Sequence, residues 1–205
     1  MVNVHIETQR LKKIMLYEGV KQLIRYVERL MQGLWLAMTL SATLWVLLSY
    51  GCIRSGKYHL PLTISELELY FYMGAVLFGA ASVILRISLL KDNRIREYLL
   101  GQTSSSDQTI NNKKLLAKLQ KLPPEEQEIF RKLMPISRWS LNIYIICWSL
   151  NSAIAVLGFV FSLTTESYTE SVPFVAAAIT LNILMFPKLQ PLMETAATFL
   201  DQENI

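Results

Sequence analysis

The sequence predicts an all-α, multipass membrane protein whose four transmembrane helices form a bundle of two hairpins. Hydrophobic residues make up 52% of the chain and charged residues only 18%, a more apolar balance than that of an ordinary soluble domain. A bilayer core of about 30 Å needs about 20 mostly apolar helical residues to cross it. Four stretches without a charged side chain approach or exceed this length, and they are residues 30–53, 69–85, 139–165 and 171–187.

The first segment, residues 1–32, is predicted to be a cytoplasmic amphipathic helix. Its apolar stripe has a spacing of three and four residues and consists of Leu16, Val20, Leu23, Val27 and Leu30. Most basic side chains of the segment lie outside the stripe. Two arrangements fit this pattern. The helix either lies in the membrane surface against anionic lipids, or continues into the first span and packs against another helix.

Residues 33–90 are predicted to form the first transmembrane hairpin, whose second span is near the lower length limit. Arg86 follows the uncharged stretch at once. A long arginine stem can snorkel, so we expect Arg86 to reach the lipid headgroups and the helix to extend to about residue 90. Gly74, Ala75 and Gly79 place small side chains along this helix. They predict close packing against another span or another protomer.

Residues 91–138 are predicted to form a cytoplasmic loop that contains an αα-hairpin. The stretch 91–100 should prolong the second span, and the serine-containing stretch 101–107 should be a flexible break. A short helix over 111–122 ends at two prolines, and glutamates then favour the start of a second helix. A hairpin of this size cannot bury its own core. It must pack on the membrane, the amino-terminal helix, another protomer or a separate protein.

Residues 139–190 are predicted to form the second transmembrane hairpin, with polar side chains linking its helices. Asn142 and Asn182 have similar predicted depths on antiparallel spans and can hydrogen-bond across the hairpin, whereas Asn151 can face the first span. These groups form either interhelical contacts or the lining of a water-filled path. The absence of intramembrane Asp, Glu and His favours the contacts. Lys188 is expected to reach the lipid headgroups.

Basic residues set the predicted orientation, because short loops rich in Lys and Arg stay on the cytoplasmic side. Residues 1–32 carry six of them and residues 91–138 carry ten, whereas the first hairpin loop carries two and the second none. Both termini, including a short tail over 191–205, are therefore expected in the cytoplasm. No Asn-Xaa-Ser/Thr sequon occurs, which is compatible with the predicted location in a bacterial inner membrane.

The sequence contains no recognisable catalytic or cofactor-binding motif. It lacks a Gly-Xaa-Ser-Xaa-Gly elbow, a phosphate-binding loop and a Cys-Xaa-Xaa-Cys pair, and its two histidines fall on opposite sides of the predicted membrane. We therefore expect neither an enzyme nor a bound metal or cofactor. The basic excess follows from the positive-inside rule and is not interleaved with aromatic residues, so direct nucleic-acid binding is not expected.

The predicted function is that of a membrane-embedded anchor or sensor, because nearly all the mass outside the lipid bilayer is predicted to face the cytoplasm. The cytoplasmic helices would recruit a cytosolic or membrane protein, and the slender bundle favours a homo-oligomer. The candidate partner contacts are Leu16, Leu23, Ile24, Ile129 and Phe130.

Two other functions are compatible with the sequence. Serine, threonine and asparagine side chains of the first and third spans could line an oligomeric pore that depolarises the membrane, and a subunit that only braces a larger membrane complex would have the same spans. The topology alone resembles that of small inner-membrane bacteriocin-immunity and phage-defence subunits, which also have four spans and cytoplasmic ends. This resemblance implies a role in a bacterial defence or immunity system.

Overall fold

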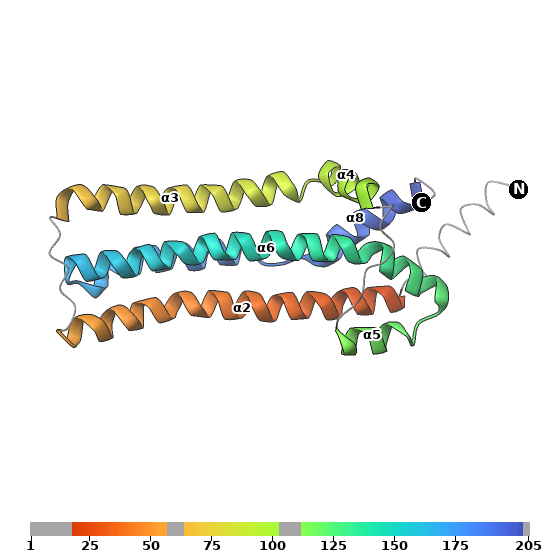
Figure 1. Cartoon of the computed structure of the whole chain (residues 1–205), viewed down its shortest axis with the longest axis horizontal. Helices are drawn as coiled ribbons and strands as arrows, with labels where there is room; N and C mark the ends of the chain where they lie inside the picture. Colours follow the sequence, from red (N-terminus) through yellow and green to blue (C-terminus); the bar gives the residue numbers. More distant parts are fainter. Residues whose placement is uncertain (1–17, 57–63, 103–111, 203–205) are drawn as a thin grey trace, which may run out of the picture. The chain divides into compact units, whose positions relative to one another are not determined.

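The computed structural model describes residues 18–56, 64–102 and 112–202, and these ranges contain helices and no strand (Figure 1). Leu16 and residues 103–107 of the predicted break lie outside the described residues. The helices are α2 (Glu18–Arg54), α3 (Ile64–Leu89), α4 (Asp92–Gln102), α5 (Lys113–Leu119), α6 (Pro124–Thr165), the 3-10 turn η1 (Tyr168–Ser171), α7 (Val172–Leu184) and α8 (Leu189–Gln202).

Four helical stretches are long and apolar enough to cross a membrane. This finding confirms the prediction of an all-α protein with four helices of membrane-spanning length. The stretches are Glu18–Arg54, Leu67–Leu89, Pro124–Thr165 and Tyr168–Leu200. The fourth stretch is interrupted, because α7 ends at Leu184 and α8 begins at Leu189.

Two of the long helices join segments that the sequence analysis separates. α2 contains both the amphipathic segment and the first span, so the continuous arrangement is the one observed. α6 begins at Pro124, and the second helix of the predicted αα-hairpin is therefore the amino-terminal end of the third span. The prediction of a separate hairpin is wrong in this respect. α5 alone is a separate short helix, and the Asn112 side chain caps it by accepting from two backbone N–H groups.

α4 and α8 also differ from the prediction. The second span ends at Leu89, and a bend at residues 90–91 separates it from α4, so the stretch 91–100 does not prolong the span. α8 begins two residues before the predicted tail and includes most of it, and the buried residues Leu189, Met193 and Ala196 occupy one face of this helix. This spacing of four and three residues is visible in the sequence and is the signal for the helix.

The chain divides into two compact units. Unit 1 consists of residues 1–30, 91–140 and 188–205, and unit 2 consists of residues 31–90 and 141–187. α2 and α6 each contribute residues to both units.

Unit 2 has an apolar core and an apolar outer surface. The core is a cluster of seven buried residues, namely Ala42, Ile154, Ala155, Phe161, Phe174, Val175 and Ala178. Leucines of α2 and aliphatic and aromatic residues of α3 are exposed, among them Leu47 at 65% and Val76 at 69%. Water disfavours so much exposed apolar surface and lipid does not, so this surface suits a bilayer.

Unit 1 has a core of its own, built by five helices. The buried side chains are Val20, Leu23 and Ile24 of α2, Ile95 and Leu99 of α4, Leu115 and Leu119 of α5, Phe130, Leu133 and Ile136 of α6, and Leu189, Met193 and Ala196 of α8. Tyr98 of α4 stacks on Trp139 of α6 with ring centroids 5.1 Å apart. Segments far apart in the sequence therefore share one hydrophobic interior.

Candidate functional site

The end of α7 is a helix terminus within the fourth apolar stretch. Pro187 cannot donate a backbone hydrogen bond and disfavours the helical conformation of the preceding residue, Phe186, so α7 stops at Leu184. The last carbonyls of a helix have no partner within it. In hydrocarbon such groups must be satisfied by other parts of the protein.

Side chains from three other helices satisfy these carbonyls. The indole N–H groups of two tryptophans and the guanidinium of Arg86 donate to them, and the positive charge of Arg86 also complements the negative end of the helix dipole. The pairs are Trp35 with the carbonyl of Asn182 at 2.7 Å, Arg86 with that of Leu184, and Trp148 with that of Met185 at 3.2 Å. The end of α7 thus joins α2, α3 and α6.

A buried polar cluster adjoins this terminus. The Ser82 hydroxyl donates to the Asn151 side-chain oxygen at 2.8 Å, and the Asn151 amide donates to the Asn182 side-chain oxygen at 2.9 Å. All three residues are fully buried. Asn142, the predicted partner of Asn182, is instead exposed. The predicted Asn142–Asn182 pair is therefore wrong, because α7 places Asn182 at the level of Asn151, more than two turns farther along α6.

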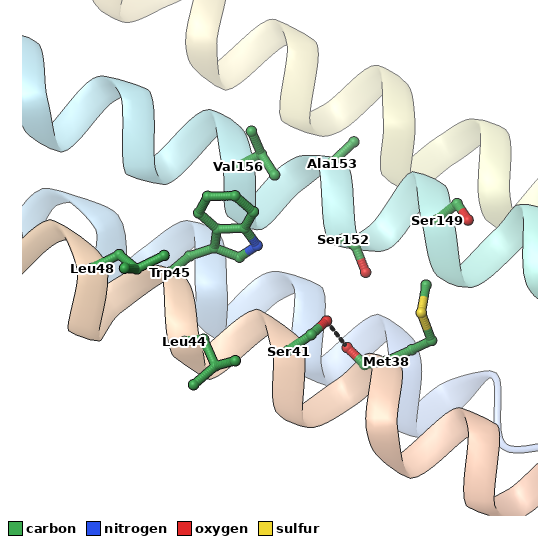
Figure 2. Close-up of a pocket in the computed structure, with 9 residues that line it drawn as sticks. All are labelled: Met38, Ser41, Leu44, Trp45, Leu48, Ser149, Ser152, Ala153 and Val156. Atoms are coloured by element: carbon green, nitrogen blue, oxygen red, sulfur yellow. Dashed lines mark hydrogen bonds between the residues drawn. The ribbon is translucent and has the colours of Figure 1, made fainter.

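A groove of about 490 Å³ lies between α2 and α6 within unit 2 (Figure 2). Most of its lining is apolar. The lining includes Met38, Ser41 and Trp45 from α2, and Ser149, Ser152 and Val156 from α6. Figure 2 shows Ser152 pointing from α6 toward α2. The hydroxyl oxygen of Ser152 is buried and has no hydrogen-bond partner among the described residues.

α2 and α6 also meet in unit 1. The backbone of Gly19 lies so close to the start of α6 that an added Cβ would collide with the carboxylate of Glu126, and it would fall 2.5 Å from a methyl carbon of Leu122 in the preceding turn. Lys118 of α5 lies over the ring of Tyr26 at 4.2 Å, a cation–π contact. The start of α2 is therefore held against the turn that joins α5 to α6.

The predicted partner contacts do not form an exposed face. Leu23, Ile24 and Phe130 are buried in the core of unit 1, and Ile129 is half-buried. An apolar stripe on a helix predicts burial, and here the burial is against other segments of the same chain. These residues therefore support unit 1 from within.

The predicted packing residues of α3 contact other spans of the same chain. An added Cβ at Gly74 would lie 3.1 Å from Leu157 of α6, and one at Gly79 would lie 3.2 Å from Leu181 of α7. Ala75 packs against the core cluster of unit 2. Lys188 is exposed and belongs to unit 1, and its contact with lipid headgroups stays a prediction. Arg86 is half-buried, and its contact with lipid headgroups also stays a prediction.

Several residues of the site were not predicted. The sequence analysis assigned no hydrogen bond to Trp35, Trp148 or Ser82, which the structure places in the site. Gly158 was also missed, although a Cβ there would lie 2.5 Å from Phe174. A buried indole requires a hydrogen-bond partner, and a glycine within an apolar helix indicates close approach. Those two signals are present in the sequence, but they do not identify the partner.

Within the described ranges, no three His, Cys, Asp or Glu side chains lie together. Comparison of the chain with protein-family models, with curated proteins and with solved structures gave no match.

Proposed function

We propose that the protein is a membrane-embedded anchor or sensor that recruits a soluble partner at the cytoplasmic face of a bacterial inner membrane. The composition of unit 1 carries this proposal. Its three segments, residues 1–30, 91–140 and 188–205, correspond closely to those that the positive-inside rule assigns to the cytoplasm. The described residues of these segments share one core although the spans separate them in the sequence. A compact helical unit provides a defined docking surface for a partner.

The two helices shared by the units support a sensing role. α2 is continuous from residue 30 to 31, and α6 is continuous from residue 140 to 141, where the units divide. A change in the spacing of these helices in unit 2 would therefore act on their contact in unit 1, at Gly19 and Glu126. Small shifts of packed helices are a common form of conformational switching. Recruitment would then depend on the state of the membrane-spanning bundle.

The exposed lysines of α5 and of the turn that follows it are the partner surface that we propose in place of the buried contacts. Lys113, Lys114 and Lys121 are exposed, and Lys118 is exposed beside Tyr26. Such a cluster favours a protein partner with an acidic surface, because opposite charges steer association and select partners. Direct nucleic-acid binding is not part of the proposal.

Contacts within the spans support an anchor more than a pore. Asn151 and Asn182 bond to each other, and Thr39 and Ser41 donate to carbonyls of their own helix. The Asn182 side-chain oxygen and the hydroxyls of Thr39 and Ser41 therefore have partners within the protein. The broad apolar faces of α2 and α3 support contact with lipid and with further copies of the chain, so we propose a homo-oligomer. A role in bacterial defence or immunity is proposed from the topology alone.

Substitution of Gly19 by leucine is expected to weaken partner capture. The tagged full-length protein is purified from its host in mild detergent, and the stoichiometry of any soluble companion is measured. The larger side chain separates α2 from Leu122 and Glu126, so we expect roughly tenfold weaker capture, equivalent to about 1.4 kcal/mol. Lys114→Glu should weaken capture as well, because it reverses a charge on the proposed surface.

Gly101→Leu is the matched control. Gly101 is exposed on α4 and has no other atom within 4 Å of an added Cβ, so capture should be unchanged. A purified protein without a stoichiometric soluble companion would contradict the proposal. Equal capture by the Gly19→Leu and Gly101→Leu proteins would contradict the role of the α2–α6 contact.

A further inference from the structure

The groove between α2 and α6 occupies the middle of both predicted spans. Ser152 is the central residue of the predicted span 139–165, and the α2 residues that line the groove fall between 38 and 48 of the predicted span 30–53. The surrounding medium at this depth is hydrocarbon. The volume of about 490 Å³ is typical of ligand pockets and far exceeds the voids of packed interiors. A lipid-soluble molecule is therefore the expected occupant.

Two hydrogen-bond donors in this apolar groove have no partner among the described residues. The Ser152 hydroxyl bonds to no described residue, whereas Ser41 across the groove donates to the carbonyl of Met38 at 2.7 Å. The indole N–H of Trp45 also donates to no residue in the described ranges, and its ring packs against Phe159 at 5.2 Å. Trp45 and Ser152 project into the groove from opposite helices in Figure 2. An unpaired polar group is costly in hydrocarbon, so a ligand that accepts these hydrogen bonds gains affinity.

The depth of the donors selects the class of ligand. The ester carbonyls of a phospholipid lie near the headgroups, so its chains would bring only hydrocarbon to Ser152. We propose that the groove binds an isoprenoid quinone. Its two ring carbonyls are acceptors for Ser152 and Trp45, and its ring and tail fill the apolar remainder of the groove. Ligand sites of this kind are mostly apolar with a few placed polar groups.

Quinone binding would also identify the stimulus of the sensor. The occupant sits between the two helices that belong to both units, so it would set their spacing in unit 2. Any effect of the quinone on partner recruitment rests on the proposed function. Binding itself does not, because it involves only residues of the groove.

Tryptophan fluorescence tests the binding directly. The full-length protein is reconstituted in vesicles of phosphatidylethanolamine and phosphatidylglycerol and titrated with decylubiquinone, a short-tailed quinone that quenches nearby tryptophans. We expect a saturable component of quenching in addition to the linear quenching by quinone dissolved in the bilayer. An excess of decylbenzene, which has the same tail and no carbonyl, should not relieve the saturable component.

Variants of the groove locate the site. Ala153→Phe fills the groove and should abolish the saturable component, whereas Ala80→Phe, at an exposed position of α3, should retain it. Ser152→Ala removes one hydrogen bond and should weaken binding about five- to tenfold. Ser88→Ala, at another exposed position of α3, should leave binding unchanged.

Purely linear quenching, saturable quenching retained by Ala153→Phe, or competition by decylbenzene would overturn the assignment. A native mass that changes in Ala153→Phe but not in Ala80→Phe would assign the groove to a second copy of the chain and would also overturn it. Absent binding with intact partner capture would leave the proposed function standing. Intact binding with absent capture would refute the proposed function alone.

Discussion

Replacement of Gly158 by alanine should destabilise unit 2, although the substitution adds only one methyl group. The new Cβ would lie 2.5 Å from the Cβ and 2.9 Å from the Cγ of Phe174, and non-bonded carbons do not approach so closely. Phe174 is 2% exposed and belongs to the core cluster, so it has little room to withdraw. Overpacking costs about 1–3 kcal/mol, so the thermal midpoint in detergent should fall by roughly 2–12 °C.

Gly33→Ala is the matched control for this effect. Gly33 is exposed in α2 and has no other atom within 4 Å of an added Cβ. Alanine favours a helix by about 1 kcal/mol relative to glycine, so the midpoint should stay equal or rise. Phe174→Leu, combined with Gly158→Ala, should recover part of the lost stability. Equal midpoints for Gly158→Ala and Gly33→Ala would contradict the close approach of α6 and α7.

Replacement of Asn151 by alanine is expected to have the second largest effect. It removes the donor to Asn182 and the acceptor for Ser82, and it leaves the Asn182 oxygen buried without this partner. Loss of a buried hydrogen-bond partner costs about 1–3 kcal/mol. In a double-mutant cycle with Asn182→Ala, the coupling should be about 0.6–1.7 kcal/mol, between the average and the maximum found for such hydrogen bonds in a membrane protein. Reversible unfolding in mixed micelles gives these free energies.

Asn142→Ala is the control for the asparagine cycle. Asn142 lies on the same helix as Asn151 but is exposed, so its replacement should change the unfolding free energy by less than about 0.5 kcal/mol. Strictly additive effects of the Asn151 and Asn182 substitutions would show that the two amides are not bonded. Coupling between Asn142 and Asn182 instead would restore the pairing predicted from the sequence.

Local composition was sufficient to predict the four apolar helices and the small residues that pack α3 against its neighbours. Length and apolar content are properties of one segment, so they can be read without knowledge of its neighbours. The continuity of α6 was harder to predict, because Pro124 fits the first turn of a helix and Pro135 is tolerated inside it. The sequence signals a helix start there but does not separate that helix from the span that follows.

The polar cluster could be predicted only in part, because its pairing depends on the axial offset between helices. The sequence identified Asn151 and Asn182 as buried linkers but paired Asn182 with Asn142. A fourth span drawn as one helix to residue 187 places Asn182 near the inner membrane face. The end of α7 at Leu184, together with its caps from Trp35 and Trp148, sets a different offset. Such caps join residues more than thirty positions apart and leave no local pattern.

Cysteine accessibility tests the central claim, which is that the segments of unit 1 lie together on the cytoplasmic side. Single cysteines replace Gln120 directly after α5, Glu194 in α8 and Thr169 in η1, all exposed positions, after Cys52 and Cys147 are replaced by serine. A membrane-impermeant maleimide is applied to spheroplasts. We predict that Thr169→Cys reacts in intact spheroplasts and that Gln120→Cys and Glu194→Cys react only after permeabilisation. Reaction of either unit 1 position in intact spheroplasts would contradict the account.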